Sequence, residues 1–211
     1  MTDPLAPRWA EPAPEPGPLT LEESARLVGG YRWLELRLFE TLGSWVRTVP
    51  EVDVKLRFHA DAFKHAWHAA LWQDLLPRGG EPRADGLTAP PSTGAEAVLD
   101  AVAAPTAAEL SVEKLVGVYR VVLPRQVATY RAHLTRTSPV GDGPAARALE
   151  IVLRDEMEDW REGELLLHSL LTSEEATRRA AAHQATLEAL LAGGGLTGPD
   201  ALPGLRTVGP P

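Results

Sequence analysis

The residues of this sequence that are able to bind a metal ion fall where a helical pattern requires apolar side chains. Successive helix residues lie about 100° apart around the axis, so residues three or four apart share a face. On this projection Glu35 lies inside an apolar arc, one turn from Tyr31 and from Phe39. A buried carboxylate without a partner is costly or takes up a proton. Glu35 therefore requires a metal ion or a charged histidine beside it.

The next segment carries three further metal-binding side chains in one apolar row. Asp61, His65 and His68 stand in the middle of residues that recur at alternating steps of four and three. Two histidines three residues apart lie on one side of a helix and can share one ion through nitrogen ligands. The same segment has a second, mostly apolar row, and the sequence leaves open which row faces the interior. The second row consists of Val52, Leu56, His59, Phe63, Ala66 and Ala70.

These groups are expected at one depth in the fold. Glu35 lies 15 residues before the turn at Pro50 and His65 lies 15 residues after it, so an antiparallel pair of helices brings them level. In a later segment Glu156 interrupts another apolar row. The expected ligands of one metal ion are Glu35, His65, His68 and Glu156. The residues expected to orient these ligands, or to replace one of them, are Asp61, Asp159, Tyr119 and Gln126.

All the segments that carry these residues are predicted to be helices. Capping residues, prolines and periodicity predict helices over residues 20–49, 51–76, 92–104, 107–135, 144–171 and 172–192, with a kink at Pro124. No segment alternates with a period of two, so no sheet is expected. Two long hairpins joined by a breaker-rich crossover over 77–94 predict an all-α four-helix bundle with a short fifth helix. The bundle is expected over 19–192, between a disordered Pro-rich tail (1–18) and a disordered Gly/Pro-rich tail (193–211).

Composition narrows the class of protein. Among 211 residues, 21 Lys and Arg stand against 29 Asp and Glu, for a formal net charge of -8. This balance argues against electrostatic binding to nucleic acid or to an anionic membrane. The absence of cysteine excludes thiolate metal sites and cysteine nucleophiles. With no long apolar run and no secretory leader pattern, we expect a cytoplasmic protein without membrane or nucleic-acid partners. A homodimer is the expected oligomer, from the habits of helical bundles.

Three segments of the chain resemble the ferritin-like superfamily, in particular small ferritin-like proteins of the actinobacterial type. They read WLELRLFETLGSWV (33–46), EVDVKLRFHADAFKHAWHAALWQDLLP (51–77) and ALEIVLRDEMEDWREGELLLHSLL (148–171). At the level of architecture the resemblance covers about 20–192. It implies a ferritin-like fold with oxygen-dependent di-iron chemistry or iron storage.

The resemblance also implies where the ligands stand, and this sequence completes the di-iron motifs only in part. The family carries a Glu on the first helix, Glu-x-x-His on the second, Glu on the third and Glu-x-x-His on the fourth. Glu35 matches the first position, whereas the second motif reads His65-x-x-His68 and the fourth reads Glu156-x-x-Asp159. Near the level of the missing third-helix carboxylate stand Gln126 and Tyr119. A site for a single ion is easier to assemble from these residues than a di-iron site.

Three functions are compatible with these patterns. The first is a non-haem oxidoreductase that binds iron or manganese in a divergent ferritin-like site. The second is a metal-free interaction or scaffold protein, in which the site is degenerate and no cofactor is bound. The third is a small-molecule binder with a bundle-centre pocket lined by Trp45, Trp72, Tyr119 and Trp160. The sequence indicates neither a substrate nor whether the protein is an enzyme.

Overall fold

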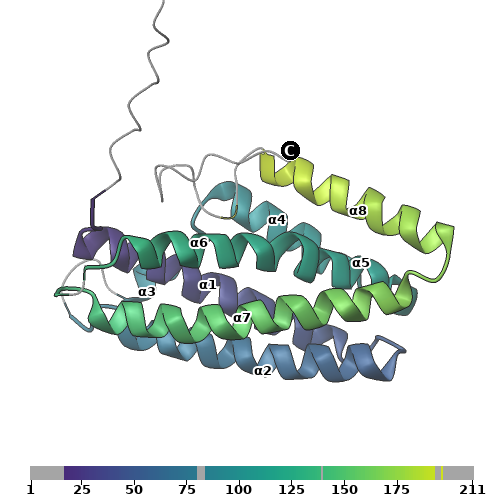
Figure 1. The fold of residues 1–211 in the computed structure, drawn as a ribbon, viewed down its shortest axis with the longest axis horizontal. Helices are drawn as coiled ribbons and strands as arrows, with labels where there is room; N and C mark the ends of the chain where they lie inside the picture. The colour runs from purple at the N-terminus through teal and green to yellow at the C-terminus, as the bar shows by residue number, and fades with distance from the viewer. Residues whose placement is uncertain (1–16, 80–83, 139, 193–195, 197–211) are drawn as a thin grey trace, which may run out of the picture.

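The computed structural model describes residues 17–79, 84–138, 140–192 and 196, and every regular element within them is a helix. The all-α prediction is thereby confirmed (Figure 1). The predicted tails, 1–18 and 193–211, lie outside the described residues except for Gly17, Pro18 and Leu196. The helices are α1 (Leu21–Trp45), α2 (Val52–Leu75), α3 (Ala84–Leu87), α4 (Thr93–Ala103), η1 (Ala108–Leu110), α5 (Ser111–Leu115), η2 (Val116–Val122), α6 (Leu123–Thr135), α7 (Gly143–Leu170) and α8 (Glu174–Ala192).

Helix α1 begins at the predicted capping box. The Thr20 hydroxyl accepts a hydrogen bond from the backbone N–H of Glu23, and the Glu23 carboxylate accepts one from the backbone N–H of Thr20. Two otherwise unpaired N–H groups are satisfied in this way. The helix continues through Gly29 and Gly30. At Gly29 a Cβ atom would stand 2.2 Å from the backbone carbonyl of Leu87, so glycine is required where the connection crosses α1.

The rotation of α2 settles which of its two rows faces inward. Val54, Phe58 and Trp72, from the row that contains the two histidines, are fully buried. In the other row, Leu56 and Phe63 are 61% and 74% exposed. The centre of the protein therefore receives the histidine row, and the second row forms an exposed apolar stripe on α2.

The region predicted as one kinked helix over 107–135 is instead four consecutive helical segments. It begins with the 3-10 turn η1 and includes η2, a π-helical stretch in which the N–H of Leu123 bonds to the carbonyl of Val118, five residues back. Pro124 follows directly; it has no N–H and its ring cannot sit close to the carbonyl of Arg120. A widened turn before the proline accommodates both restrictions and keeps the chain helical.

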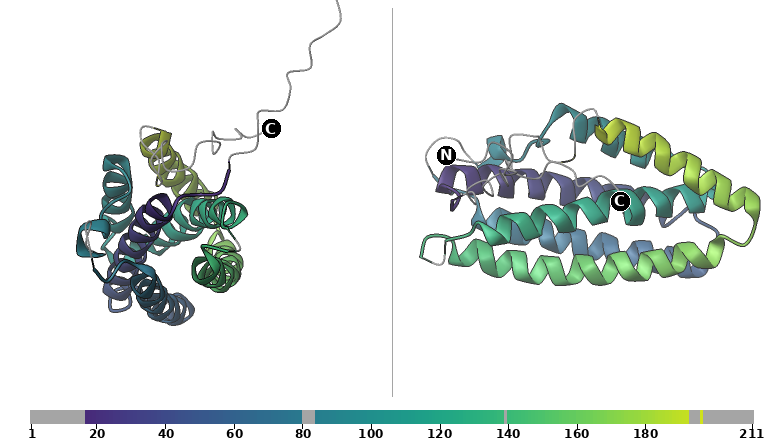
Figure 2. Two further views of the ribbon diagram at one scale, coloured as in Figure 1. Left: turned by 90° about the vertical axis from the view of Figure 1, so that its left-hand side faces the viewer. Right: turned by 45° about the horizontal axis from the view of Figure 1, so that its top comes forward.

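Four long helical stretches lie side by side: α1, α2, the continuous α5–η2–α6 stretch, and α7 (Figures 1 and 2). Helix α1 packs on α2, and α7 packs on both α2 and α6, while α8 packs on η2 and α4 packs on α8. Gly163 of α7 allows one close approach, since a Cβ atom there would stand 2.1 Å from the Tyr119 ring. Within the described residues, no helix carries a sufficiently long and apolar window to cross a membrane.

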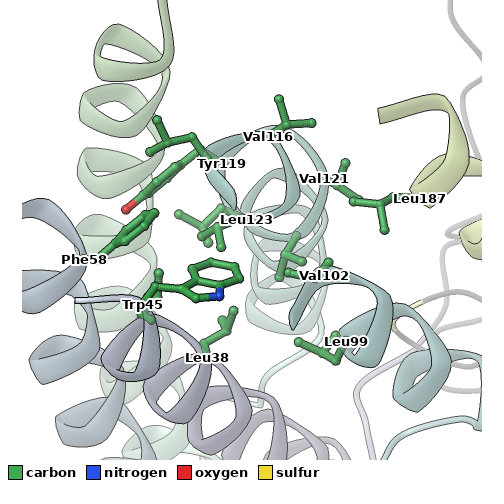
Figure 3. Packing of buried hydrophobic residues seen from close by; sticks show 14 of the residues in the cluster. Leu38, Trp45, Phe58, Leu99, Val102, Val116, Tyr119, Val121, Leu123 and Leu187 are labelled. Atoms are coloured by element: carbon green, nitrogen blue, oxygen red, sulfur yellow. The ribbon is translucent and has the colours of Figure 1, made fainter. Parts of the chain in front are cut away.

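Two hydrophobic clusters fill the interior. The first contains Trp45, Phe58 and Tyr119 together with residues from α4 and α8 (Figure 3). The second contains Tyr31 and Trp72, whose ring centroids lie 5.4 Å apart. On α2, on the α5–η2–α6 stretch and on α7, a short polar segment separates the residues of one cluster from those of the other. On α1 the second cluster ends at Tyr31 and the first begins at Leu34, next to Glu35. The candidate functional residues occupy this polar layer.

Candidate metal centre

The polar layer gathers four buried metal-binding side chains from three helices. Glu35 comes from α1, His65 and His68 from α2, and Glu156 from α7; each is no more than 1% exposed. One ligand atom from each residue lies within 4.8 Å of all the others. The structure thus brings together the four residues that the sequence predicted as ligands.

The two histidines present the same nitrogen to the same two carboxylates. His65 Nδ1 lies 2.6 Å from Glu35 Oε2 and 3.4 Å from Glu156 Oε1. His68 Nδ1 lies 3.7 Å from Glu35 Oε2 and 3.2 Å from Glu156 Oε1. Donor atoms bound to one ion at about 2.1 Å stand roughly 3 to 3.4 Å apart. These four nitrogen–oxygen separations lie around that range, so the group could hold a single ion.

The second oxygen of Glu35 is held by helix α6. The Tyr130 hydroxyl donates to Glu35 Oε1 at 2.6 Å, and the Gln126 side-chain amide donates to the same oxygen at 2.8 Å. The amide of Gln126 also donates to the Tyr130 oxygen at 2.7 Å. These bonds leave Oε2 as the oxygen that faces the histidines. Gln126, which stands near the level of the missing third-helix carboxylate, therefore hydrogen-bonds a candidate ligand.

Charge in the layer is balanced between the carboxylates and the imidazoles. Burial by itself lowers the pKa of His65, but the charges of Glu156 and Glu35 outweigh it and raise that pKa to about 9. Burial likewise opposes protonation of His68, yet hydrogen bonds to Glu156 and Glu35 raise its pKa to about 11. Although burial favours the neutral acid, the two histidines hold the pKa of Glu35 well below its usual range. Burial raises the pKa of Glu156 above its ordinary value. When no metal ion is bound, protonated His65 and His68 thus balance the charge of the buried carboxylates.

One carboxylate oxygen of the cluster also remains available to a metal ion. Glu156 Oε2 is buried and has no hydrogen-bond partner among the described residues. A buried polar atom without a partner is unusual in native proteins and requires an explanation. Two nitrogen and two carboxylate donors are a set that iron(II) and manganese(II) accept. The residues present therefore fit one divalent transition-metal ion.

Comparisons with family models, with curated proteins and with solved structures find no match to this chain.

Two of the residues predicted to orient the ligands or to replace one of them, Asp61 and Asp159, belong to a separate ionic cluster one helical turn away. Arg57 forms ion pairs with Asp61 and Asp159, and Lys64 forms a second ion pair with Asp159. Asp61 also accepts a hydrogen bond from the Tyr119 hydroxyl. Asp61 was expected to orient an imidazole, but Arg57 pairs with its Oδ1 and the Tyr119 hydroxyl donates to its Oδ2 instead. The charges of Asp61 and Asp159 are thus balanced by Arg57 and Lys64.

Sequence reasoning missed two residues that hydrogen-bond a candidate ligand: Tyr130, which donates to Glu35, and Asp155. Asp155 Oδ2 lies 3.2 Å from His68 Nε2, on the side of the imidazole away from the other three ligands. Asp155 lies in the acidic run RDEMEDWREGE, which is typical of a solvated helix face. The only available signal was its position next to Glu156.

The aromatic residues predicted to line a common pocket are distributed differently. Trp45 and Tyr119 belong to the first hydrophobic cluster, whereas Trp72 belongs to the second, beyond the polar layer. Trp45 packs on Phe58 with ring centroids 5.4 Å apart, and Trp72 packs on Tyr130 at 5.6 Å. These rings therefore fill two cores on either side of the candidate metal centre.

Proposed function

We propose that this protein is a ferritin-like helical bundle that binds one iron or manganese ion and acts as a non-haem oxidoreductase. The observation that carries the proposal is the meeting of Glu35, His65, His68 and Glu156 inside the protein, with their ligand atoms within 4.8 Å of one another. The pairing of α1 with α2 and of α6 with α7 supports the ferritin-like arrangement that the sequence resemblance implies.

Charge supports one ion rather than two. With neutral imidazoles, the carboxylates of Glu35 and Glu156 balance a single divalent cation. A second divalent ion would add two positive charges to a buried layer, which is costly without further anions. Of the other acids nearby, Asp61 and Asp159 are already paired with Arg57 and Lys64, and Asp155 contacts His68.

Within such a site the protein's residues orient donors and exclude water. Tyr130 and Gln126 hold one oxygen of Glu35, so the other oxygen is directed toward the histidines. The four ligands are buried, which excludes bulk water and larger reactants from them. When bound, a redox-active ion supplies Lewis-acid and electron-transfer chemistry.

Metal analysis of untagged protein tests this proposal. After anaerobic loading with Fe(II) or Mn(II) and desalting, the wild type should retain one ion per chain, and Glu35→Gln, His65→Ala, His68→Ala and Glu156→Gln should each lose it. His59→Ala and Glu158→Gln are matched controls, because both residues are exposed on the same helices, and they should retain the ion.

The thermal midpoint of the wild type should also rise with added metal; an ion at 100 times its Kd adds about 2.7 kcal/mol to the unfolding free energy. Background metal content in the loaded wild type would refute the proposal.

A metal-free interaction or scaffold protein is the second candidate. It is favoured by the contacts of His65 with Glu35 and of His68 with Glu156, which pair the buried charges without any ion. The exposed apolar stripe on α2, which includes Leu56 and Phe63, offers such a protein a surface for association. On this alternative the ligand variants change the unfolding free energy, while no metal is retained and added metal leaves the thermal midpoint unchanged.

A further inference from the structure

Asp155 contacts the nitrogen of His68 that faces away from the other candidate ligands. His68 Nδ1 faces Glu156 and Glu35 inside the protein, whereas His68 Nε2 lies 3.2 Å from Asp155 Oδ2. The Asp155 side chain is 26% exposed, while His68 is fully buried. Two successive residues of α7, Asp155 and Glu156, thus contact opposite nitrogens of the same ring.

The identity of the nitrogen that carries the proton decides whether His68 is a competent ligand. A neutral imidazole has one N–H and one lone pair, and a metal ion binds the lone pair. With Nδ1 facing the other ligands, the proton must reside on Nε2. A carboxylate at Nε2 stabilises the proton there and fixes the orientation of the ring.

The neighbouring histidine lacks this support. His65 Nδ1 also faces the carboxylates, but its Nε2 is buried without a hydrogen-bond partner among the described residues. The ring of Trp67 lies beside the His68 ring, with centroids 5.5 Å apart, and restricts it further. The two histidines are therefore not equivalent, and His68 is the one held in position from outside the site.

We propose that Asp155 is a positioning residue, which fixes the proton of His68 on Nε2 so that Nδ1 is presented to the metal ion. The inference rests on the proposed metal site and assigns a role to a residue outside the set of four ligands. Carboxylates that hydrogen-bond a metal-ligating histidine contribute tenfold to a hundredfold to metal affinity. The same contribution is expected of Asp155.

The test compares Zn²⁺ affinity in the wild type with that in three variants of the full chain. Asp155→Ala should weaken binding by about tenfold to a hundredfold, and Asp155→Glu should restore most of the loss. Glu158→Gln, which removes an exposed acid three residues further along α7, should leave the Kd unchanged and so control for the general charge of the helix. Circular dichroism and the thermal midpoint of metal-free Asp155→Ala establish that the variant is folded.

A spectroscopic measurement separates positioning from a merely structural role. Zinc is diamagnetic, so ¹H–¹⁵N correlation spectra of the zinc-loaded protein reveal which His68 nitrogen carries a proton. The wild type should show a protected Nε2–H with the metal on Nδ1, and this resonance should be lost in Asp155→Ala. Coordination through Nε2 in the wild type, or an unchanged Kd in Asp155→Ala, would overturn the role of Asp155. Failure of the wild type to bind zinc, iron or manganese would instead refute the proposed metal site itself, and the inference with it.

Discussion

His65 Nδ1 lies 2.6 Å from Glu35 Oε2, and this contact joins α2 to α1 inside the polar layer. Both residues are buried to within 1% of complete burial, so water does not screen the interaction. A proton and a metal ion compete for the space between the same two atoms. The behaviour of this site with pH and on substitution therefore reports on what occupies it.

Metal affinity should increase with pH. In the metal-free protein the pKa of His65 is raised to about 9 and that of His68 to about 11, so at neutral pH both imidazoles carry protons that the metal must displace. Each displaced proton changes the Kd by about tenfold per pH unit. Titrations with Mn²⁺ between pH 6 and 8 should show this increase, and calorimetry in buffers of different ionisation enthalpy should detect proton release. A Kd that does not vary over this interval would contradict the protonation scheme.

Replacing Glu35 by alanine should strongly destabilise the metal-free protein. The change removes the acceptor of Tyr130 and Gln126 and leaves the protonated His65 facing only Glu156. Loss of one partner from a buried ion pair costs about 3–5 kcal/mol. Urea unfolding should show a loss of this size in Glu35→Ala. Glu40→Ala, which removes an exposed carboxylate from the same helix, should stay within about 0.5 kcal/mol of the wild type.

The contact between Gly163 and Tyr119 should not tolerate a methyl group. A Cβ atom at Gly163 would stand 2.1 Å from the Tyr119 ring, which is fully buried and cannot turn aside. Gly163→Ala should therefore lower the unfolding free energy by about 1–3 kcal/mol despite the better helix propensity of alanine. In contrast, Gly43 of α1 is exposed and its Cβ position is open. Gly43→Ala should raise the unfolding free energy by about 0.5–1 kcal/mol, and an equal response of the two glycines would refute the packing argument.

Acid should destabilise the fold through a histidine outside the metal centre. His133 is fully buried; its Nδ1 lies 3.2 Å from the Tyr31 hydroxyl and its Nε2 lies 3.4 Å from the Ser24 hydroxyl. Burial lowers its pKa to about 4, below the ordinary value of 6.5. Between these two pH values the unfolded chain binds a proton that the folded chain does not bind. The unfolding free energy therefore falls as pH falls, by about 3 kcal/mol over the whole interval.

His133→Gln tests this assignment, since glutamine retains hydrogen-bonding capacity but does not titrate. The difference in unfolding free energy between the wild type and His133→Gln should shrink as pH is lowered from 6.5 to 4. His59→Gln, at an exposed position, should show a constant difference from the wild type. A constant difference for His133→Gln as well would assign the acid sensitivity to other groups.

The helical class, and the inward face of α1, can be read from the order of residues along the chain. The period of the apolar residues placed Glu35 on the inward arc of α1, and the equal distances of Glu35 and His65 from Pro50 placed them at one depth. Such patterns are local, because they depend on the geometry of one helix and the length of one turn. For the same reason the capping box at Thr20 was readable from two residues.

Tertiary structure decided what periodicity leaves open. Both rows of α2 were compatible with burial, and only packing against α1 and α7 turned the histidine row inward. Asp61 shares that row, yet Arg57 and Tyr119 pair with it, so its position on the helix did not predict its role. Nothing in the sequence distinguishes Asp155 from its acidic neighbours, because its contact with His68 depends on how α7 packs against α2. The face of a residue is fixed by its own helix, whereas its partner is fixed by the rotation and depth of a neighbouring helix, and these depend on the packing of the whole core.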